Sequence, residues 1–246
     1  MAAQKKVEPE ITLWERLERP AAAQRTALTP QKIAEVAVKV ADAEGFAAVT
    51  MRRLATELGV APMAAYRHVS GKDDLWALMV DRVTAEVVVA EDVAGWREVL
   101  RAYAVGSRRL MLAHPWLAQL PTPHFALTPN RMAMADRQLA ALEHHGLDAD
   151  TIMTAFRTVG AYVHGVSQSE VALRQYMQDN GWTSGEEARA GLAPQMMYLM
   201  GTGRYPAYRR YAIGAGRKDD AAWQFETGLD CVLDGIAVRL GLAPRA

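Results

Sequence analysis

Apolar residues recur at helical spacing along almost the whole chain, and this periodicity restricts the fold more than any other feature of the sequence. The repeat is clear over residues 30–44, 51–58, 62–68 and 72–83, and again near 95–113, 127–145, 149–173 and 219–241. Valine-rich runs that alternate polar and apolar residues, as strands do, are absent. The sequence therefore predicts an all-α fold.

Composition limits the classes of protein to consider. Half of the 246 residues are apolar, so the chain can bury a substantial core. The formal net charge is zero, so any binding of nucleic acid has to be argued from a local patch of charge. Cys231 is the single cysteine, which excludes an intramolecular disulfide framework and a cysteine-rich zinc site. With no signal-like apolar segment near Met1 and no run long enough to cross a bilayer, we expect a cytoplasmic protein without membrane association.

Three parts are expected along the chain. Residues 1–28 are predicted to be a flexible N-terminal arm, 29–75 a helix-turn-helix domain, and 76–246 a larger helical body. Within the arm, the stretch Ile11–Leu17 offers the alternative of a helical turn packed on the body. Between 174 and 218 the pattern specifies no structure, and we expect Arg204–Tyr211 to be a solvated loop. The alternatives are binding of RNA or of single-stranded nucleic acid, and a cover over a pocket entrance.

The segment from Thr50 to Val69 has the residue types that a helix-turn-helix needs. Thr50 can cap the first helix, and Gly59 can adopt the turn conformation that side chains resist. Ala55 is small enough for a close helix crossing. The remaining inward positions are apolar: Leu54, Leu58, Val60, Ala65 and Val69.

The exposed side of this motif is predicted to contact DNA. Its cations face a single acid, Glu57, and helix N-termini and hydroxyl or imidazole groups suit phosphates. Small or apolar side chains at its centre could meet thymine methyl groups. The expected DNA-binding residues are Thr50, Met51, Arg52, Arg53, Pro62, Met63, Ala64, Tyr66, Arg67, His68 and Lys72.

At this point the chain resembles the DNA-binding head of the tetracycline-repressor-like (TetR) regulators. The resemblance covers Thr29 to about Val83 and is carried by four runs and one lysine. They are Gly45-Phe46, Thr50-Met-Arg-Arg-Leu-Ala55, Leu58-Gly-Val60, Tyr66-Arg-His-Val69 and Lys72. The resemblance implies DNA-contacting positions at Arg52, Met63, Tyr66, His68 and Lys72, and double-stranded, palindromic operator DNA as the partner.

The C-terminal part resembles the body of the same family more loosely. The similar stretches are Trp96-Arg-Glu-Val-Leu100, Leu112-Ala-His-Pro115 and Phe225–Gly235. Membership implies an all-helical effector pocket and a two-fold dimer. Tetracycline itself is not expected as effector, because Val88 and Gly106 lie near positions where its polar and metal-chelating contacts would be required.

Two late helices are predicted to form the dimer interface as a four-helix bundle. Each has an apolar face, and Gly160 and Gly165 would allow close approach. The alternative is that both helices pack inside one chain. The expected interface residues are Phe156, Val159, Val163, Val166, Leu229, Val232, Leu233 and Ile236.

Aromatic and methionine side chains between the head and these helices suggest an adaptable apolar pocket. Any one of them could instead be plain core, and His164 could be a satisfied core histidine. The expected effector-binding residues are Tyr103, Met111, Trp116, Phe125, Met134, Tyr162 and His164.

The sequence thus predicts a three-helix DNA-binding head on a helical body for ligand binding and dimerisation. The expected function is a repressor that leaves its operator when a small apolar or aromatic effector binds. An effector-independent activator or architectural protein is the alternative. A helical enzyme is less favoured, because nucleophile-elbow, phosphate-loop, dinucleotide and zinc-protease motifs are absent. No cofactor and no metal are expected.

Overall fold

A computed structural model describes residues 11–18, 28–120 and 127–242. These residues form helices and no strand, which confirms the predicted all-α class. The chain divides into two units, Met1–Arg82 and Val83–Ala246. The division falls inside a helix, seven residues after the boundary expected at 75.

Unit 1 contains the helices of the predicted head. They are α1 (Leu13–Glu18), α2 (Pro30–Glu44), a 3-10 turn η1 (Phe46–Ala48), α3 (Met51–Leu58), α4 (Pro62–Tyr66) and α5 (Lys72–Thr84). Thr29 caps α2 by accepting a hydrogen bond from the Lys32 amide at 3.1 Å, with Pro30 in the first helical position. Ile33 and Ala37 of α2 and Met79 of α5 are fully buried, so the apolar stripes form the core of this unit.

Part of the expected N-terminal arm is helical. Residues Leu13–Glu18 form α1, the Leu13 side chain is buried, and Arg16 forms an ion pair with Asp74 in the first turn of α5. The helical turn weighed as an alternative is therefore present, but its ion pair joins it to the predicted head in unit 1, whereas the alternative placed it on the body. Most of the other residues of the 1–28 segment lie outside the described part of the chain.

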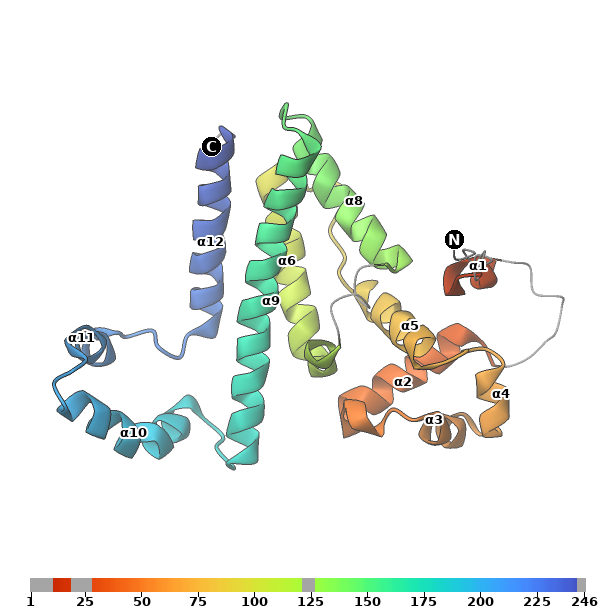
Figure 1. The fold of residues 1–246 in the computed structure, drawn as a ribbon, viewed down its shortest axis with the longest axis horizontal. Helices are drawn as coiled ribbons and strands as arrows, with labels where there is room; N and C mark the ends of the chain where they lie inside the picture. The colour runs from red at the N-terminus through yellow and green to blue at the C-terminus, as the bar shows by residue number, and fades with distance from the viewer. Residues whose placement is uncertain (1–10, 19–27, 121–126, 243–246) are drawn as a thin grey trace, which may run out of the picture. The chain divides into compact units, whose positions relative to one another are not determined.

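Unit 2 is organised around one long helix. Its elements are α6 (Trp96–Ala113), a 3-10 turn η2 (Pro115–Gln119), α8 (Pro129–Glu143), α9 (Ala149–Asp179), α10 (Gly185–Gly201), α11 (Pro206–Gly214) and α12 (Ala221–Leu240). α9 packs against α6, α8 and α12, and Figure 1 shows α9 and α12 side by side. Leu100, Leu142, Phe225, Leu229 and Leu233 are almost completely buried in the cluster that joins these helices.

The expectation for residues 174–218 was wrong in part. α9 continues to Asp179, and Arg204–Tyr211 enters helix α11 instead of forming a loop. Pro206 occupies the first turn of α11, where its fixed φ favours the helix. The periodicity gave no signal because apolar side chains of α10 and α11, including Met197, Tyr198 and Ile213, are largely exposed.

No helix in the described ranges is both long enough and apolar enough to span a membrane.

The contact between α9 and α12 depends on a glycine. The Tyr162 hydroxyl donates a hydrogen bond to the Phe225 carbonyl oxygen at 2.8 Å, which places the phenol directly above Gly228. A Cβ atom on Gly228 would lie 2.2 Å from the Tyr162 hydroxyl oxygen, far inside van der Waals contact. This position therefore requires the absence of a side chain.

We predict that Gly228→Ala destabilises unit 2. The added methyl group displaces Tyr162 and breaks its hydrogen bond, at a cost of about 1–3 kcal/mol. Gly214→Ala is the control, because a Cβ atom there meets no atom within 4 Å. Urea denaturation followed by circular dichroism at one fixed protein concentration should show a lower midpoint for Gly228→Ala only. Equal midpoints for wild type and Gly228→Ala would contradict the packing described.

Candidate DNA-binding surface and effector site

The turn between α3 and α4 is fixed by local hydrogen bonds. The Thr50 hydroxyl accepts from the Arg53 amide at 3.1 Å and caps α3. Gly59 ends α3 in the left-handed conformation at φ 66°, and the Val60 amide donates to the Ala55 carbonyl at 3.0 Å. This arrangement closes the turn that the sequence predicts and sets the direction of α4.

The underside of α3 and α4 is buried, and the opposite side faces solvent. Leu54, Ala55, Ala65 and Val69 have almost no exposed surface. By contrast, Met63 and Tyr66 expose 69% and 47% of their surface although both are large apolar side chains. Among the other predicted contacts, Thr50, Pro62 and Arg67 are exposed, whereas Met51, Ala64 and His68 are partly buried. The exposed face therefore coincides with most of the predicted DNA-binding residues.

Arg53, one of the expected DNA contacts, is engaged in ion pairs within unit 1. Its guanidinium pairs with Glu44 at 2.7 Å and with Glu57 at 2.7 Å, and these carboxylates raise the pKa of Arg53 above its ordinary value. In turn, the hydrogen bond from Arg53 lowers the pKa of Glu44. We therefore assign Arg53 to a clamp between α3 and the end of α2.

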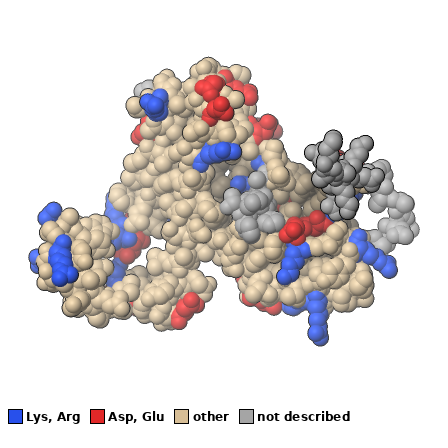
Figure 2. Space-filling view, viewed as in Figure 1, with Lys and Arg blue, Asp and Glu red and all other residues tan. Residues whose placement is uncertain are grey.

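Three other cations remain open to a ligand. Arg52, Arg67 and Lys72 are exposed and form no ion pair with the described carboxylates. Figure 2 shows blue basic side chains extending from the surface of this unit. Unpaired, exposed cations beside a helix-turn-helix are suited to DNA phosphates.

In unit 2, the structure brings together part of the predicted effector site. Tyr103 of α6 and Met134 of α8 are both buried in one small cluster with Val99. Met111 and Trp116 are also buried, at the end of α6 and in η2. Phe125 lies outside the described residues.

Two predicted effector residues lie elsewhere. Tyr162 packs against the core cluster that contains α9 and α12 and bonds the Phe225 carbonyl. His164 is exposed on α9. The sequence pattern placed Tyr162 among the aromatic pocket residues and His164 as a polar contact, but it could not tell which face of α9 each occupies. Neither adjoins Tyr103 and Met134 in their cluster.

The predicted dimer residues pack within a single chain. Val159, Val163, Leu229, Leu233 and Ile236 belong to the buried core. Val166 and Val232 pack against it, and Phe156 is partly buried. These side chains therefore follow the alternative for the two helices, in which they pack inside one chain. The outward faces of α9 and α12 carry different residues, including Gly160, Gly165, Cys231, Gly235 and Val238.

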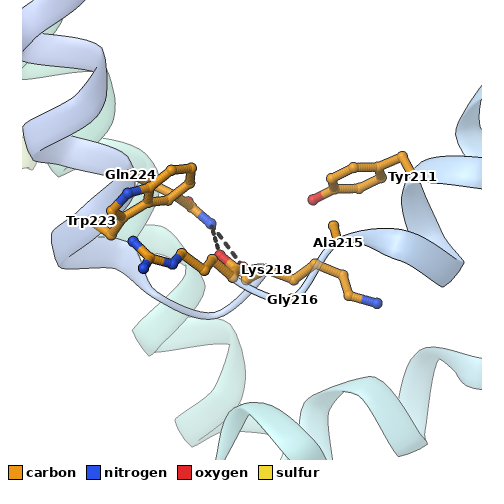
Figure 3. A pocket seen from close by; sticks show the side chains of 7 residues that line it. Tyr211, Ala215, Gly216, Lys218, Trp223 and Gln224 are labelled. Carbon is orange, nitrogen blue, oxygen red and sulfur yellow. Dashed lines mark hydrogen bonds between the residues drawn. The ribbon is translucent and has the colours of Figure 1, made fainter.

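Two pockets lie in the region that the sequence pattern left unspecified. One, of about 410 Å³, lies between the end of α11 and the start of α12, where Tyr211 and Trp223 line it (Figure 3). Gln224 donates to the carbonyls of Arg217 and Lys218 at 3.0 and 2.9 Å and holds this turn. A second pocket, of about 650 Å³, is formed by α10 and α11 and the turn between them. Its lining residues include Met197, Met200, Tyr205, Arg209, Arg210 and Ile213.

A capped helix-turn-helix with exposed cations, attached to an all-helical second unit, defines a DNA-binding regulator. Comparison with known proteins gives the family. Residues 33–79 match "Bacterial regulatory proteins, tetR family", and residues 90–240 match "Tetracyclin repressor-like, C-terminal domain". The chain therefore belongs to the TetR family of transcriptional regulators.

Individual relatives agree with this assignment. The repressor DrrR1 of Streptomyces coeruleorubidus is 33% identical over 228 residues, which cover 92% of this chain and 83% of that protein. Apo ActR from Streptomyces coelicolor superposes with a TM-score of 0.73 at 28% identity, covering 90% of this chain and all of ActR. ActR in complex with actinorhodin gives a TM-score of 0.70 at 28% identity, covering 86% and 96% of the two chains.

We predict that Lys72→Ala weakens DNA binding through lost phosphate contact. The slope of log affinity against log salt should become shallower by about 0.9 for each contact removed. Lys39→Ala is the matched control, because Lys39 lies on α2 and is paired with Glu35 at 2.9 Å. Fluorescence anisotropy over a salt series measures both slopes. If Lys39→Ala changed the slope as much as Lys72→Ala, the DNA-facing side would be misplaced.

Proposed function

We propose that the protein is a homodimeric repressor that binds a palindromic operator and leaves it when a small apolar or aromatic effector binds unit 2. The observation that carries this proposal is the exposed, unpaired cation set Arg52, Arg67 and Lys72 on a closed helix-turn-helix. The relative DrrR1 carries the name of a transcriptional repressor, which supports repression as the activity.

The effector part of the proposal is supported by the interior of unit 2. Tyr103 and Met134 combine an aromatic ring and a flexible thioether in one buried cluster, bordered by Val87, Val89 and Val93. Such side chains adapt to large apolar ligands. ActR, which is similar over most of its length, has been solved with actinorhodin bound.

The dimer part of the proposal uses the outward faces of α9 and α12. A Cβ atom at Gly160, Gly165 or Gly235 would meet no atom within 4 Å, so these faces are open in the single chain. Val238 beside them exposes 84% of its surface. Two such helices from each chain would form a four-helix bundle, and a dimer would place two recognition helices on successive half-sites.

Helix α5 connects the two activities in this mechanism. It begins at Lys72 on the DNA-facing side of unit 1 and ends at Thr84, beyond the division between the units. In this mechanism α5 has two positions relative to the DNA-binding helices. An effector that binds the protein more tightly when α5 is in one of them shifts the equilibrium toward that position. The same difference in affinity lowers the affinity for DNA, because the coupling between the two ligands is reciprocal.

Selection of bound fragments from random DNA tests the operator. A palindromic site with steep salt dependence is the expected result. The same labelled fragment then reports release in a screen of aromatic natural products by anisotropy, with actinorhodin as the first compound. No enriched sequence would contradict sequence-specific repression. An enriched site from which no compound releases the protein would favour the effector-independent alternative.

We predict that Gly235→Arg dissociates the dimer, because it places a bulky charge on the open face of α12. Gly214→Arg is the control, since Gly214 also has open space around it but lies on α11. Analytical ultracentrifugation should show a monomer for Gly235→Arg and a dimer for the control. If only Gly214→Arg dissociated the dimer, the result would place the interface on α10 and α11 and contradict the interface proposed on α12.

A further inference from the structure

Arg131 lies on the side of α8 that faces the interior of unit 2. It precedes Met134, Gln138 and Leu142 at spacings of three, four and four residues, which places all four side chains on one stripe of the helix. Met134, Gln138 and Leu142 are buried. Met134 packs with Tyr103 of α6, so the stripe faces the predicted effector residues. Figure 2 shows a hollow near α6 and α8 with basic atoms at its rim.

Among the described residues, Arg131 lacks the charge or hydrogen-bond partners that other inward-facing arginines of unit 2 have. Arg108 pairs with Glu170 at 2.7 Å, and Arg137 donates to the carbonyls of Val89 and Ala90 at 2.8 and 2.5 Å. Arg131 forms no ion pair with any described carboxylate and donates no side-chain hydrogen bond to a described group. Burial lowers the pKa of its guanidinium, since nothing offsets the loss of hydration.

A partly buried cation without a counter-charge is costly unless a ligand supplies the charge. The guanidinium presents a planar fork of donors that matches a carboxylate or sulfonate. Beside it, Met134 and Tyr103 offer apolar and aromatic surface. One ligand that satisfies both features is an aromatic molecule that carries an acidic group.

We propose that Arg131 binds the acidic group of the effector and that the effector is therefore an anionic aromatic compound. This inference rests on the proposed function, in which unit 2 binds the effector. It adds the charge of the ligand and the residue that selects it.

The test uses two fluorescent probes with the DNA-free, full-length protein. The probes are 1-anilinonaphthalene-8-sulfonate and its uncharged analogue N-phenyl-1-naphthylamine, which differ by the sulfonate. Wild type should bind the sulfonate probe more tightly. Arg131→Met should lower the affinity for the sulfonate probe by about tenfold or more, which is the range of a charge-assisted hydrogen bond. The affinity for the uncharged probe should stay within about twofold of wild type. Arg131→Lys should retain part of the preference.

Arg210→Met is the matched control, because Arg210 lines the pocket formed by α10 and α11. It should leave both affinities unchanged. The proposal is overturned if the wild type shows no preference for the sulfonate probe, if Arg131→Met weakens both probes equally, or if the loss occurs in Arg210→Met instead. Circular dichroism confirms that each variant is folded.

Operator binding separates this inference from the proposed function. Arg131→Met should still bind the selected operator with wild-type affinity, since Arg131 belongs to unit 2. A loss of probe preference with intact operator binding supports the role of Arg131. If an uncharged compound released DNA equally well from wild type and from Arg131→Met, the inference about Arg131 would be overturned. The repressor function would still stand.

Discussion

The burial of apolar side chains between α6, α9 and α12 is the constraint on which the rest of unit 2 depends. Phe225, Leu229 and Leu233 are almost fully enclosed there, and the buried residues of α9 end at Ser167. Beyond that point α9 continues for about three turns with exposed side chains such as Leu173 and Tyr176. The core therefore fixes the first two thirds of α9, and α10 and α11 are attached to a part of the helix that the core does not hold.

Local sequence signals predicted unit 1 well because its features act over a few residues. Thr29 and Thr50 cap helices through amides three positions away, and Gly59 supplies a left-handed turn. Arg53 escaped this reasoning. Its partner Glu44 is nine positions away on another helix, and only the path of the chain through Gly45 brings the two side chains together.

The same reasoning had less success in unit 2. Helical periodicity shows that Val159 and Leu229 lie on apolar faces, but it does not show whether such a face meets the same chain or a second copy. It placed Tyr162 and Tyr103 in one site, although their helices direct them into different clusters. In α10 and α11 most large apolar residues are exposed, so no continuous buried stripe existed for the pattern to reveal. These limits share one cause, which is that periodicity describes a helix and not its neighbours.

Arginines have distinct uses across the chain. Arg97, which is 5% exposed, pairs with Asp230 and Asp234 and ties the start of α6 to α12. The Nε and Nη1 atoms of Arg97 have no hydrogen-bond partner among the described residues, so the buried guanidinium is incompletely satisfied.

The length of α5 has a mechanical consequence. Its 13 residues form a rod of about 20 Å. A tilt of only about 3° about one end moves the other end by about 1 Å, by the geometry of a rigid helix of this length. A helix of this length therefore turns a slight rotation at Thr84 into a displacement of about 1 Å at Lys72.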